Sequence, residues 1–213
     1  MPHYKAPVRD FQFVLNEYLQ LSQYKAVPGF EDAGADLISP LLEEGAKLCE
    51  EVLFPLNQKG DAEGLRFDAG RVHMPDGFKE AYATYVQGGW PAFTCDPAYG
   101  GQGLPEVMNM PLMEMVCSAN LAFGLTPGLS HGAYNAIHLH ASDDLKAKYL
   151  PKLVSGEWSG VMCLTEPQAG TDLGLIRTRA EPQSDGSYKL FGNKIFISSG
   201  EHELTSNILH LVL

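Results

Sequence analysis

The chain has 213 residues, of which 45% are hydrophobic and 19% charged, a composition that excludes a disordered protein and is typical of one that buries a core. Its formal net charge of −11 argues against nucleic acid or an anionic membrane surface as the main partner. Because it shows no signal-peptide pattern and no apolar run of about 18 residues, we expect a cytoplasmic protein with no integral membrane segment.

The first part of the chain is patterned as helices. A one-sided apolar stripe predicts an amphipathic helix over residues 7–21. Ser39-Pro40 has the form of an N-cap followed by a first-turn proline, and predicts that a second, longer helix starts there and ends near Gly60. The Gly- and Asp-rich residues 61–75 predict a turn-rich surface linker.

A third helix is predicted over residues 76–87, and an irregular stretch follows the glycines after it, over residues 90–103. Gly100, Gly101 and Gly103 superficially resemble a phosphate-binding loop, but no strand precedes them at the spacing of a dinucleotide motif. We therefore interpret this stretch as a structural loop. Two further helices are predicted over 104–122 and 127–141, and a last one is predicted after a Ser-Asp-Asp cap.

Cysteine and histidine side chains are the potential metal ligands of the chain. Four cysteines lie in apolar stretches without C-x-x-C spacing, namely Cys49, Cys95, Cys117 and Cys163. We expect them to be buried, reduced thiols rather than a disulfide or metal framework. Three histidines fall in one predicted helix, namely His131, His138 and His140. No carboxylate or thiol completes a compact ligand set with them, so we predict no metal site and interpret them as ordinary interior or surface residues.

From Glu157 onward the pattern changes to short β-branched and aromatic segments, which predict successive strands. These segments span residues 158–165, 187–191, 194–198 and 207–213. The predicted fold class is α+β, with a helical domain up to about residue 156 followed by the start of a β domain. Because the last apolar segment ends at Leu213 within an apparent strand, we expect a fragment of a longer protein or a second chain that covers the edge.

The most informative stretch is Val161–Leu175, with the sequence V-M-C-L-T-E-P-Q-A-G-T-D-L-G-L. An apolar run leads into a Thr-Glu-Pro turn and a small-residue loop, whose amides and Thr171 hydroxyl suit an anionic or carbonyl-rich ligand. Glu166 is the conspicuous carboxylate, and we interpret it as fixing the turn by accepting backbone amides rather than as a base. Asp172 is likewise interpreted as a loop cap.

This stretch resembles the signature T-E-P-x-A-G-[S/T]-D of the acyl-CoA dehydrogenase family, and G-N-K-I-F-I-S-S-G at Gly192–Gly200 resembles that family's second flavin-contacting segment. The resemblance covers the whole chain. The segment Tyr4–Glu17 is similar to that of a large bacterial subgroup with an N-terminal extension, one type of member of which acts on methylmercaptopropionyl-CoA. Two residues depart from the family pattern: Leu175 stands where a small residue is preferred, and Phe196 where many members have Trp.

The resemblance implies a division of the chain into an N-terminal extension over residues 1–34, the family's α-helical N-terminal domain over 35–156 and part of an antiparallel, β-barrel-like middle domain over 157–213. The family's C-terminal helical domain would be absent from this chain. The catalytic base, a Glu of that later domain, is expected beyond residue 213, so no catalytic residue is assigned. FAD as cofactor, an acyl-CoA substrate, an electron-transfer flavoprotein as partner and a homo-oligomeric state are implied by the same resemblance.

The first motif would supply one set of flavin contacts by this resemblance. Met162 and Leu164 would line the isoalloxazine ring, and Thr165 would offer its amide and hydroxyl to the pyrimidine end. Thr171 would serve the pyrophosphate region and the CoA side of the substrate. These residue types suit a flavin, which needs an apolar wall for its ring and hydrogen-bond donors along its polar edge.

The second segment would supply the remaining contacts. Phe196 would pack against the dimethylbenzene side, Ile197 would present main-chain groups, and Ser198 would place its hydroxyl near N5 and O4. Ser198 replaces a commoner Thr and keeps the donor, whereas Phe196 in place of Trp loses an indole N–H and some stacking area.

The reaction implied by the resemblance is α,β-dehydrogenation of an acyl-CoA thioester, in which a carboxylate removes the α-proton while the β-hydrogen leaves as hydride to the flavin. An acyl-CoA oxidase is an alternative, because the sequence does not show whether oxygen reaches reduced flavin. A non-catalytic flavin- or CoA-binding or assembly module is a third interpretation, which a C-terminal helical domain in the native polypeptide would exclude.

Overall fold

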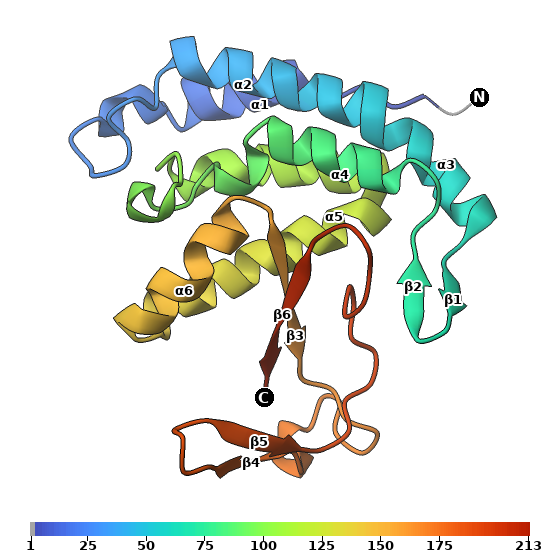
Figure 1. Cartoon of the computed structure of the whole chain (residues 1–213). Helices are drawn as coiled ribbons and strands as arrows, with labels where there is room; N and C mark the ends of the chain where they lie inside the picture. Colours follow the sequence, from blue (N-terminus) through green and yellow to red (C-terminus); the bar gives the residue numbers. More distant parts are fainter. Residues whose placement is uncertain (1–2) are drawn as a thin grey trace.

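The computed structural model describes residues 3–213 and shows a helical part followed by a part that contains most of the strands (Figure 1). Strands β3 (Trp158–Cys163) and β6 (Asn207–Val212) extend from the helices as a stem. The hairpin of β4 (Arg179–Pro182) and β5 (Tyr188–Phe191) lies at the far end of this stem. The helices-then-strands order predicted from the sequence is confirmed.

The first helix is close to its predicted range. It consists of α1 (Val8–Gln12) and a π-helical turn over Phe13–Tyr18. The second is a continuous rod of α2 (Ala35–Lys47), a π-helical turn over Leu48–Leu53 and α3 (Phe54–Glu63). Among residues 3–213, no helix combines the length and the hydropathy that crossing a bilayer would require.

The second helix begins before the predicted start at Ser39-Pro40, so that prediction was wrong. Its N-cap is Gly34, and Pro40 lies inside α2. Ile38 and Leu42 lie one turn apart and are both buried in the helical core. Burial of this face outweighs the hydrogen bond that Pro40 cannot donate, because most helix stability in proteins comes from packing.

The predicted linker over residues 61–75 contains a hairpin that the sequence analysis missed. Strands β1 (Arg66–Asp68) and β2 (Arg71–His73) pair antiparallel around a turn at Ala69-Gly70. Helix α4 (Phe78–Gln87) follows and ends at two glycines, as predicted.

The loop over residues 90–103 is structural, as predicted. Gly100 and Gly103 have φ angles of +92° and +70°, in the region that favours glycine. A Cβ atom on Gly101 would lie 1.9 Å from the carbonyl oxygen of Cys95, so no larger residue fits there. Backbone conformation at Gly100 and Gly103 and a close backbone contact at Gly101 therefore account for these glycines.

The two helices predicted over 104–122 and 127–141 are one element, α5 (Asn109–His140), with a kink at Asn120. Asn120 is fully buried and has φ −158° and ψ 89°. Its Nδ2 donates to the carbonyl oxygen of Leu53 at 3.1 Å, and its Oδ1 accepts from the amide of Phe123 at 3.0 Å. The kink is thus fixed by the Asn120 side chain, whereas Pro127 lies within the second half of α5.

Helix α6 (Asp143–Val154) follows, with Ser142 in the predicted N-cap position but without a side-chain capping hydrogen bond. Strand β3 then packs against α5. A Cβ atom on Gly160 would lie 2.4 Å from the Cβ of Ala133, and the amide of Gly160 donates to the Ser130 hydroxyl at 3.1 Å. The absent side chain at Gly160 therefore lets the strand lie directly on the helix.

The described strands form three two-stranded sheets, and no closed barrel is present among residues 3–213. The β1–β2 and β4–β5 pairs are antiparallel, but β3 and β6 pair in parallel, with Trp158 opposite Asn207 and Cys163 opposite Val212. The expected antiparallel pairing was therefore wrong for β3 and β6, the strand pair that carries the start of the first motif. Strand β4 was not predicted, and residues 194–198 form no strand.

We expect Asn120→Leu to lower the free energy of unfolding by about 3 kcal/mol, because it leaves a buried carbonyl and a buried amide without partners. Chemical denaturation followed by circular dichroism measures this change. Leu121→Ala, at an exposed neighbouring position of α5, is the control and should change stability much less. Equal effects of the two substitutions would contradict the role assigned to Asn120.

Candidate functional site

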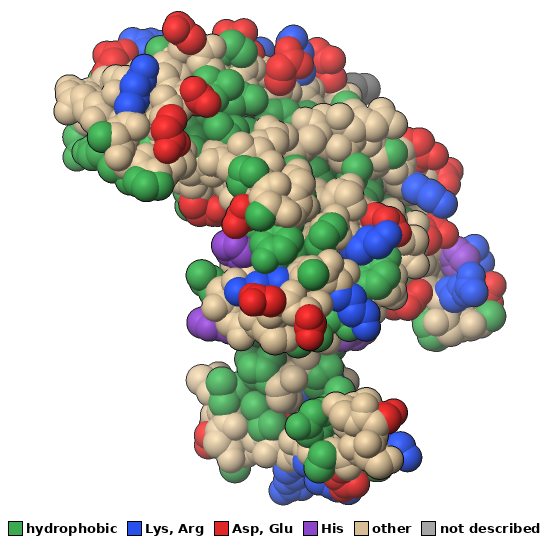
Figure 2. Space-filling model, turned by 60° about the vertical axis from the view of Figure 1, so that its left-hand side comes forward, with side chains coloured by type: hydrophobic (Ala, Val, Ile, Leu, Met, Phe, Trp, Pro, Cys, Tyr) green, Lys and Arg blue, Asp and Glu red, His purple; other side chains and the backbone are tan. Residues whose placement is uncertain are grey.

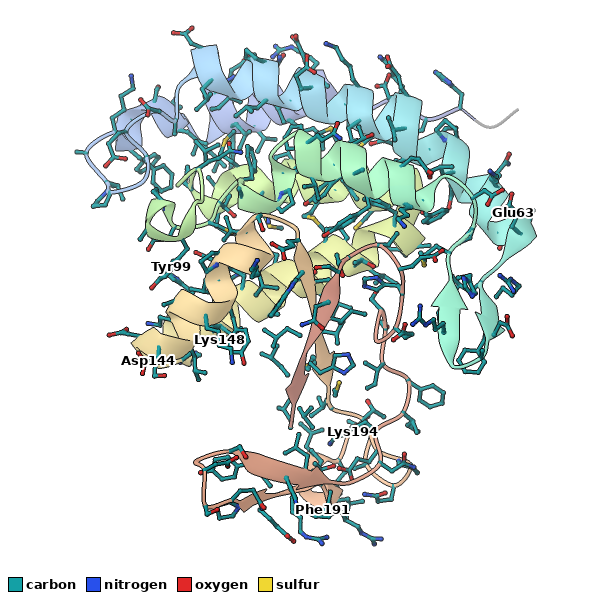
Figure 3. All side chains as sticks on the ribbon, in the orientation of Figure 1. Glu63, Tyr99, Asp144, Lys148, Phe191 and Lys194 are labelled. Atoms are coloured by element: carbon teal, nitrogen blue, oxygen red, sulfur yellow. The ribbon has the colours of Figure 1, made fainter. Side chains whose placement is uncertain are left out.

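The two sequence motifs lie side by side in the structure. The amide of Ile195 donates to the carbonyl oxygen of Thr165 at 2.9 Å. The Nζ atom of Lys194 donates to the carbonyl oxygen of Leu164 at 3.0 Å. The segment that follows β3 and the segment 194–198 are therefore joined by their main chains, and Figure 3 shows Lys194 between the stem and the β4–β5 hairpin.

Residues 194–198 form no strand because their backbone turns. Phe196 has φ +57° and Ser199 has φ +54°, which places both in the left-handed region that bulky residues rarely adopt. The β-branched and aromatic composition of this run predicted a strand, but the Ile195 amide donates to the single carbonyl oxygen of Thr165 and the run forms no strand ladder. The turn leaves the Phe196 side chain 87% exposed.

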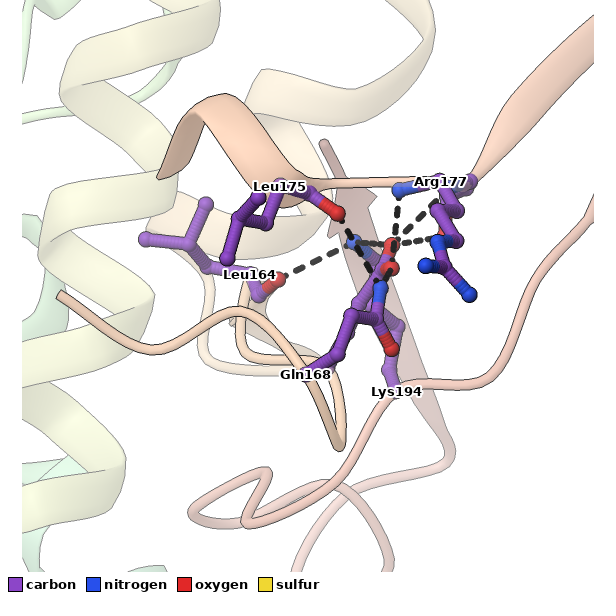
Figure 4. A network of polar contacts seen from close by, with 7 residues as sticks. Leu164, Gln168, Leu175, Arg177 and Lys194 are labelled. Carbon is purple, nitrogen blue, oxygen red and sulfur yellow. Dashed lines mark hydrogen bonds and ion pairs between the residues drawn. The ribbon is translucent and has the colours of Figure 1, made fainter. Parts of the chain in front are cut away.

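Glu166 is buried and accepts the hydrogen bonds of a polar network, which Figure 4 shows with Gln168, Arg177 and Lys194 labelled. Its carboxylate accepts hydrogen bonds from the amides of Arg177 and Thr178, both at 2.9 Å, and from the Thr178 hydroxyl. It also accepts from Gln168 and forms an ion pair with Lys194 at 2.8 Å. The prediction that Glu166 fixes the turn by accepting backbone amides is confirmed.

These donors change the acidity of Glu166. The Lys194 ammonium and the Thr178 hydroxyl, followed by the Arg177 amide, hold the pKa of Glu166 well below its ordinary value. A carboxylate that is so strongly stabilised in its charged form, with its side chain 2% exposed, is a poor general base. Asp172 acts as predicted too, since its Oδ1 caps the next turn by accepting from the amide of Gly174 at 3.0 Å.

The residues assigned to flavin contact open onto two separate hollows. Met162, half-exposed on β3, lines an apolar groove of about 630 Å³ together with Gly132 of α5 and Leu211 of β6. Ile197 and Ser198 line a different cleft, of about 590 Å³, between the 197–202 segment and helices α3, α4 and α5. Figure 2 shows hydrophobic side chains exposed at the narrow waist below the helices, where the stem lies.

The remaining assigned residues of the first motif lie either beside the start of the segment 194–198 or farther along the loop after β3. Leu164 and Thr165 are partly exposed, directly before Glu166. Thr171 lies in an exposed bend just before the short 3-10 turn Leu173–Leu175. The structure thus brings Leu164 and Thr165 to the start of the second segment, while Met162 lines a different hollow from Ser198. Their flavin contacts remain predictions.

Four side chains of this region had no role in the sequence analysis. Lys194 and Thr178 bind Glu166, and the hydroxyls of Ser199 and the buried Thr126 on α5 lie 2.7 Å apart. Only Lys194 had a signal in the sequence, as a lone cation within the apolar run of the second motif. Thr178 and Thr126 could not be found, because their partners are distant along the chain.

His131, His138 and the cysteines have ordinary structural roles. Nε2 of His131 lies 2.9 Å from Glu106, and Nε2 of His138 lies 3.2 Å from Asp96, so both rings pair with carboxylates of the preceding loop. The four cysteines are free thiols, of which three are buried as predicted and Cys117 is only partly buried, and burial raises the pKa of Cys49 to about 12. Such thiols are unreactive.

Comparisons with known proteins agree with this geometry. The model of the acyl-CoA dehydrogenase N-terminal domain matches residues 41–157. The chain is 46% identical over 210 residues to 3-methylmercaptopropionyl-CoA dehydrogenase of Ruegeria pomeroyi, with 99% of this chain and 36% of that protein covered. It is 38% identical over 217 residues to a butyryl-CoA dehydrogenase of Syntrophomonas wolfei, with coverages of 99% and 35%.

Solved structures also match the fold of this chain. Butyryl-CoA dehydrogenase from Megasphaera elsdenii matches with a TM-score of 0.67 and 26% identity, over 78% of this chain and 42% of that one. A structure described as the electron transferring flavoprotein of Acidaminococcus fermentans matches with a TM-score of 0.65 and 25% identity, over 76% and 40% of the two chains. The chain spans about a third of the length of the curated relatives it matches.

We expect Glu166→Gln to destabilise the protein at pH 7 and to lose this effect in acid. The lowered pKa of folded Glu166 means that its charge stabilises the fold above the ordinary glutamate pKa of about 4.3, and that this contribution disappears as pH falls through the folded value. Chemical denaturation of both proteins across an acidic pH series measures the difference. Glu31→Gln, at an exposed position, is the control. A pH-independent difference would contradict the assignment.

Proposed function

The chain belongs to the acyl-CoA dehydrogenase family, and on that basis we propose that it forms the helical part and one flavin-facing wall of an enzyme that dehydrogenates an acyl-CoA thioester to the 2-enoyl-CoA with FAD. The observation that carries this proposal is the contact between the T-E-P-Q-A-G-T-D loop and the G-N-K-I-F-I-S-S-G segment through Lys194 and Ile195. Two motifs that are separate in sequence are thereby joined, with Leu164 and Thr165 beside the start of the second segment.

The side chains of the two motifs suit a flavin. Met162 and Phe196 offer exposed apolar area, and the hydroxyls of Thr165 and Ser198 form no hydrogen bond with the rest of residues 3–213. A flavin ring needs an apolar wall and donors along its polar edge, and when bound it supplies a hydride acceptor. We propose that Thr165 and Ser198 donate to that edge and that Phe196 and Met162 shield the ring from water.

Leu164 and Ile197 complete the proposed wall, and Thr171 would contact a different part of the ligands. Leu164 would pack against the ring, and the main chain of Ile197 would lie along it. Thr171, in its exposed bend, would serve the pyrophosphate and the CoA side of the substrate. Glu166 is not assigned as the base, because its carboxylate is buried and already accepts five hydrogen bonds.

We extend the proposal to the organisation and partners of the protein. Residues 35–156 and 157–213 would be the helical domain and part of a barrel-like middle domain, after an extension over 1–34. The electrons would pass to an electron-transfer flavoprotein, and the enzyme would act as a homo-oligomer in the cytoplasm. Acyl-CoA dehydrogenases among the relatives, and the match to a structure described as an electron transferring flavoprotein, support this proposal.

The direct test uses the polypeptide purified from its native cell. Its intact mass gives the length of the native chain, and extraction identifies any bound flavin. We expect bound FAD and anaerobic loss of the visible flavin absorbance on addition of an acyl-CoA. A protein that takes up FAD but is not reduced would favour a binding module, and one that takes up no FAD would contradict the proposal.

Thr165→Val removes one hydroxyl with little change in shape, and we expect it to weaken FAD binding about tenfold, the effect of about 1.4 kcal/mol from one lost hydrogen bond. Titration of the apoprotein with FAD measures the change, and anaerobic reduction measures any loss in rate. Thr84→Val, at an exposed position of α4, is the matched control. Unchanged flavin content together with unchanged turnover would count against the assignment of Thr165.

A further inference from the structure

Lys194 is the one lysine among residues 3–213 whose ammonium group pairs with a buried carboxylate. Its side chain is 11% exposed and that of Glu166 is 2% exposed. The cation donates to Glu166 Oε1 at 2.8 Å and to the main-chain oxygen of Leu164 at 3.0 Å. Burying a charged lysine is unfavourable unless it is paired and hydrogen-bonded, and both conditions are met here.

The two contacts of Lys194 join different parts of the site. Glu166 holds the amides of Arg177 and Thr178 without any help from Lys194. Among side chains of the described residues, Lys194 alone links this carboxylate network to the second motif. We therefore expect that removal of Lys194 leaves the hydrogen bonds of the loop after β3 intact. The same change should free the start of the segment 194–199.

This segment is anchored at both ends. The Lys194 ammonium and the Ile195 amide hold its start to the main chain of Leu164 and Thr165. The hydroxyl of Ser199, 2.7 Å from that of Thr126, holds its end to α5. Between the anchors, Phe196 adopts a left-handed backbone that a bulky residue keeps only when its surroundings impose it.

We propose that Lys194 is a positioning residue for the flavin wall. It fixes the span Phe196–Ser198 against Leu164 and Thr165, so that the two motifs present their apolar and donor groups to one ligand. The inference rests on the proposed function, because the ligand it invokes is the flavin. It adds a residue that acts through the contact residues and does not itself touch the cofactor.

The test is Lys194→Met, which keeps the length of the side chain and removes its charge and donors, in the complete native protein. We expect an unchanged far-ultraviolet circular dichroism spectrum, FAD affinity reduced tenfold or more, and a shifted visible spectrum of the bound flavin. We also expect the amide of Ile195 to exchange with solvent at least tenfold faster, which needs no cofactor to observe. The amides of Arg177 and Thr178 should remain protected.

Two matched variants separate positioning from general destabilisation. Lys152→Met removes another lysine ion pair, with Glu157 at 2.6 Å, on the surface. Ile38→Val loosens the helical core at a fully buried site. Neither should shift the flavin spectrum or the exchange of Ile195. If Lys194→Met does not fold, Lys194→Gln keeps one donor and should give smaller changes in the same direction.

The outcomes are distinct. Wild-type protein that takes up no FAD would overturn the proposed function and this inference together. Wild-type protein that binds FAD, with Lys194→Met or Lys194→Gln equal to it in affinity, spectrum and Ile195 exchange, would overturn only the inference. A spectral shift of the same size in Ile38→Val would also overturn it, because the change would then follow stability rather than position.

Discussion

A single buried carboxylate holds the irregular part of this structure together. Glu166 accepts five hydrogen bonds, from Gln168 in the loop that follows it, from the two residues just before β4 and from Lys194. An ionised carboxylate is stable away from water only with such a set of partners, so each partner is fixed by the same charge. The loop after β3 and the second motif take their positions from this group, although neither is part of a regular sheet there.

The helical part supplies the rigid base for this arrangement. Asn120 sets the kink of α5, and the second half of that helix lies directly against β3 through the contact between Gly160 and Ala133. The same half of α5 carries Thr126, which meets Ser199. Helix α5 therefore supports the site through two contacts. One is with β3, which leads into the first motif, and the other is with the end of the second motif.

Much of this architecture could be predicted from the sequence, because helices, glycine loops and the Glu166 turn depend on local patterns. The change from helices to strands at Glu157 and the role of Glu166 were predicted correctly. The errors came where distant contacts outweigh local preference. Pro40 lies inside a helix because Ile38 and Leu42 are buried on either side of it. Phe196 leaves the extended conformation because its segment is held at its two ends.

The parallel pairing of β3 and β6 has a consequence for how this protein folds. Parallel strands cannot be joined by a tight turn, and here the connection contains both motifs and the β4–β5 hairpin. The helices and the hairpin form from contacts that are near in sequence, whereas the β3–β6 pair must close a long loop first, which is slow. Residues 164–198, which include most of the proposed flavin contacts, lie within that loop, so we expect this part of the chain to order after the helices that support it.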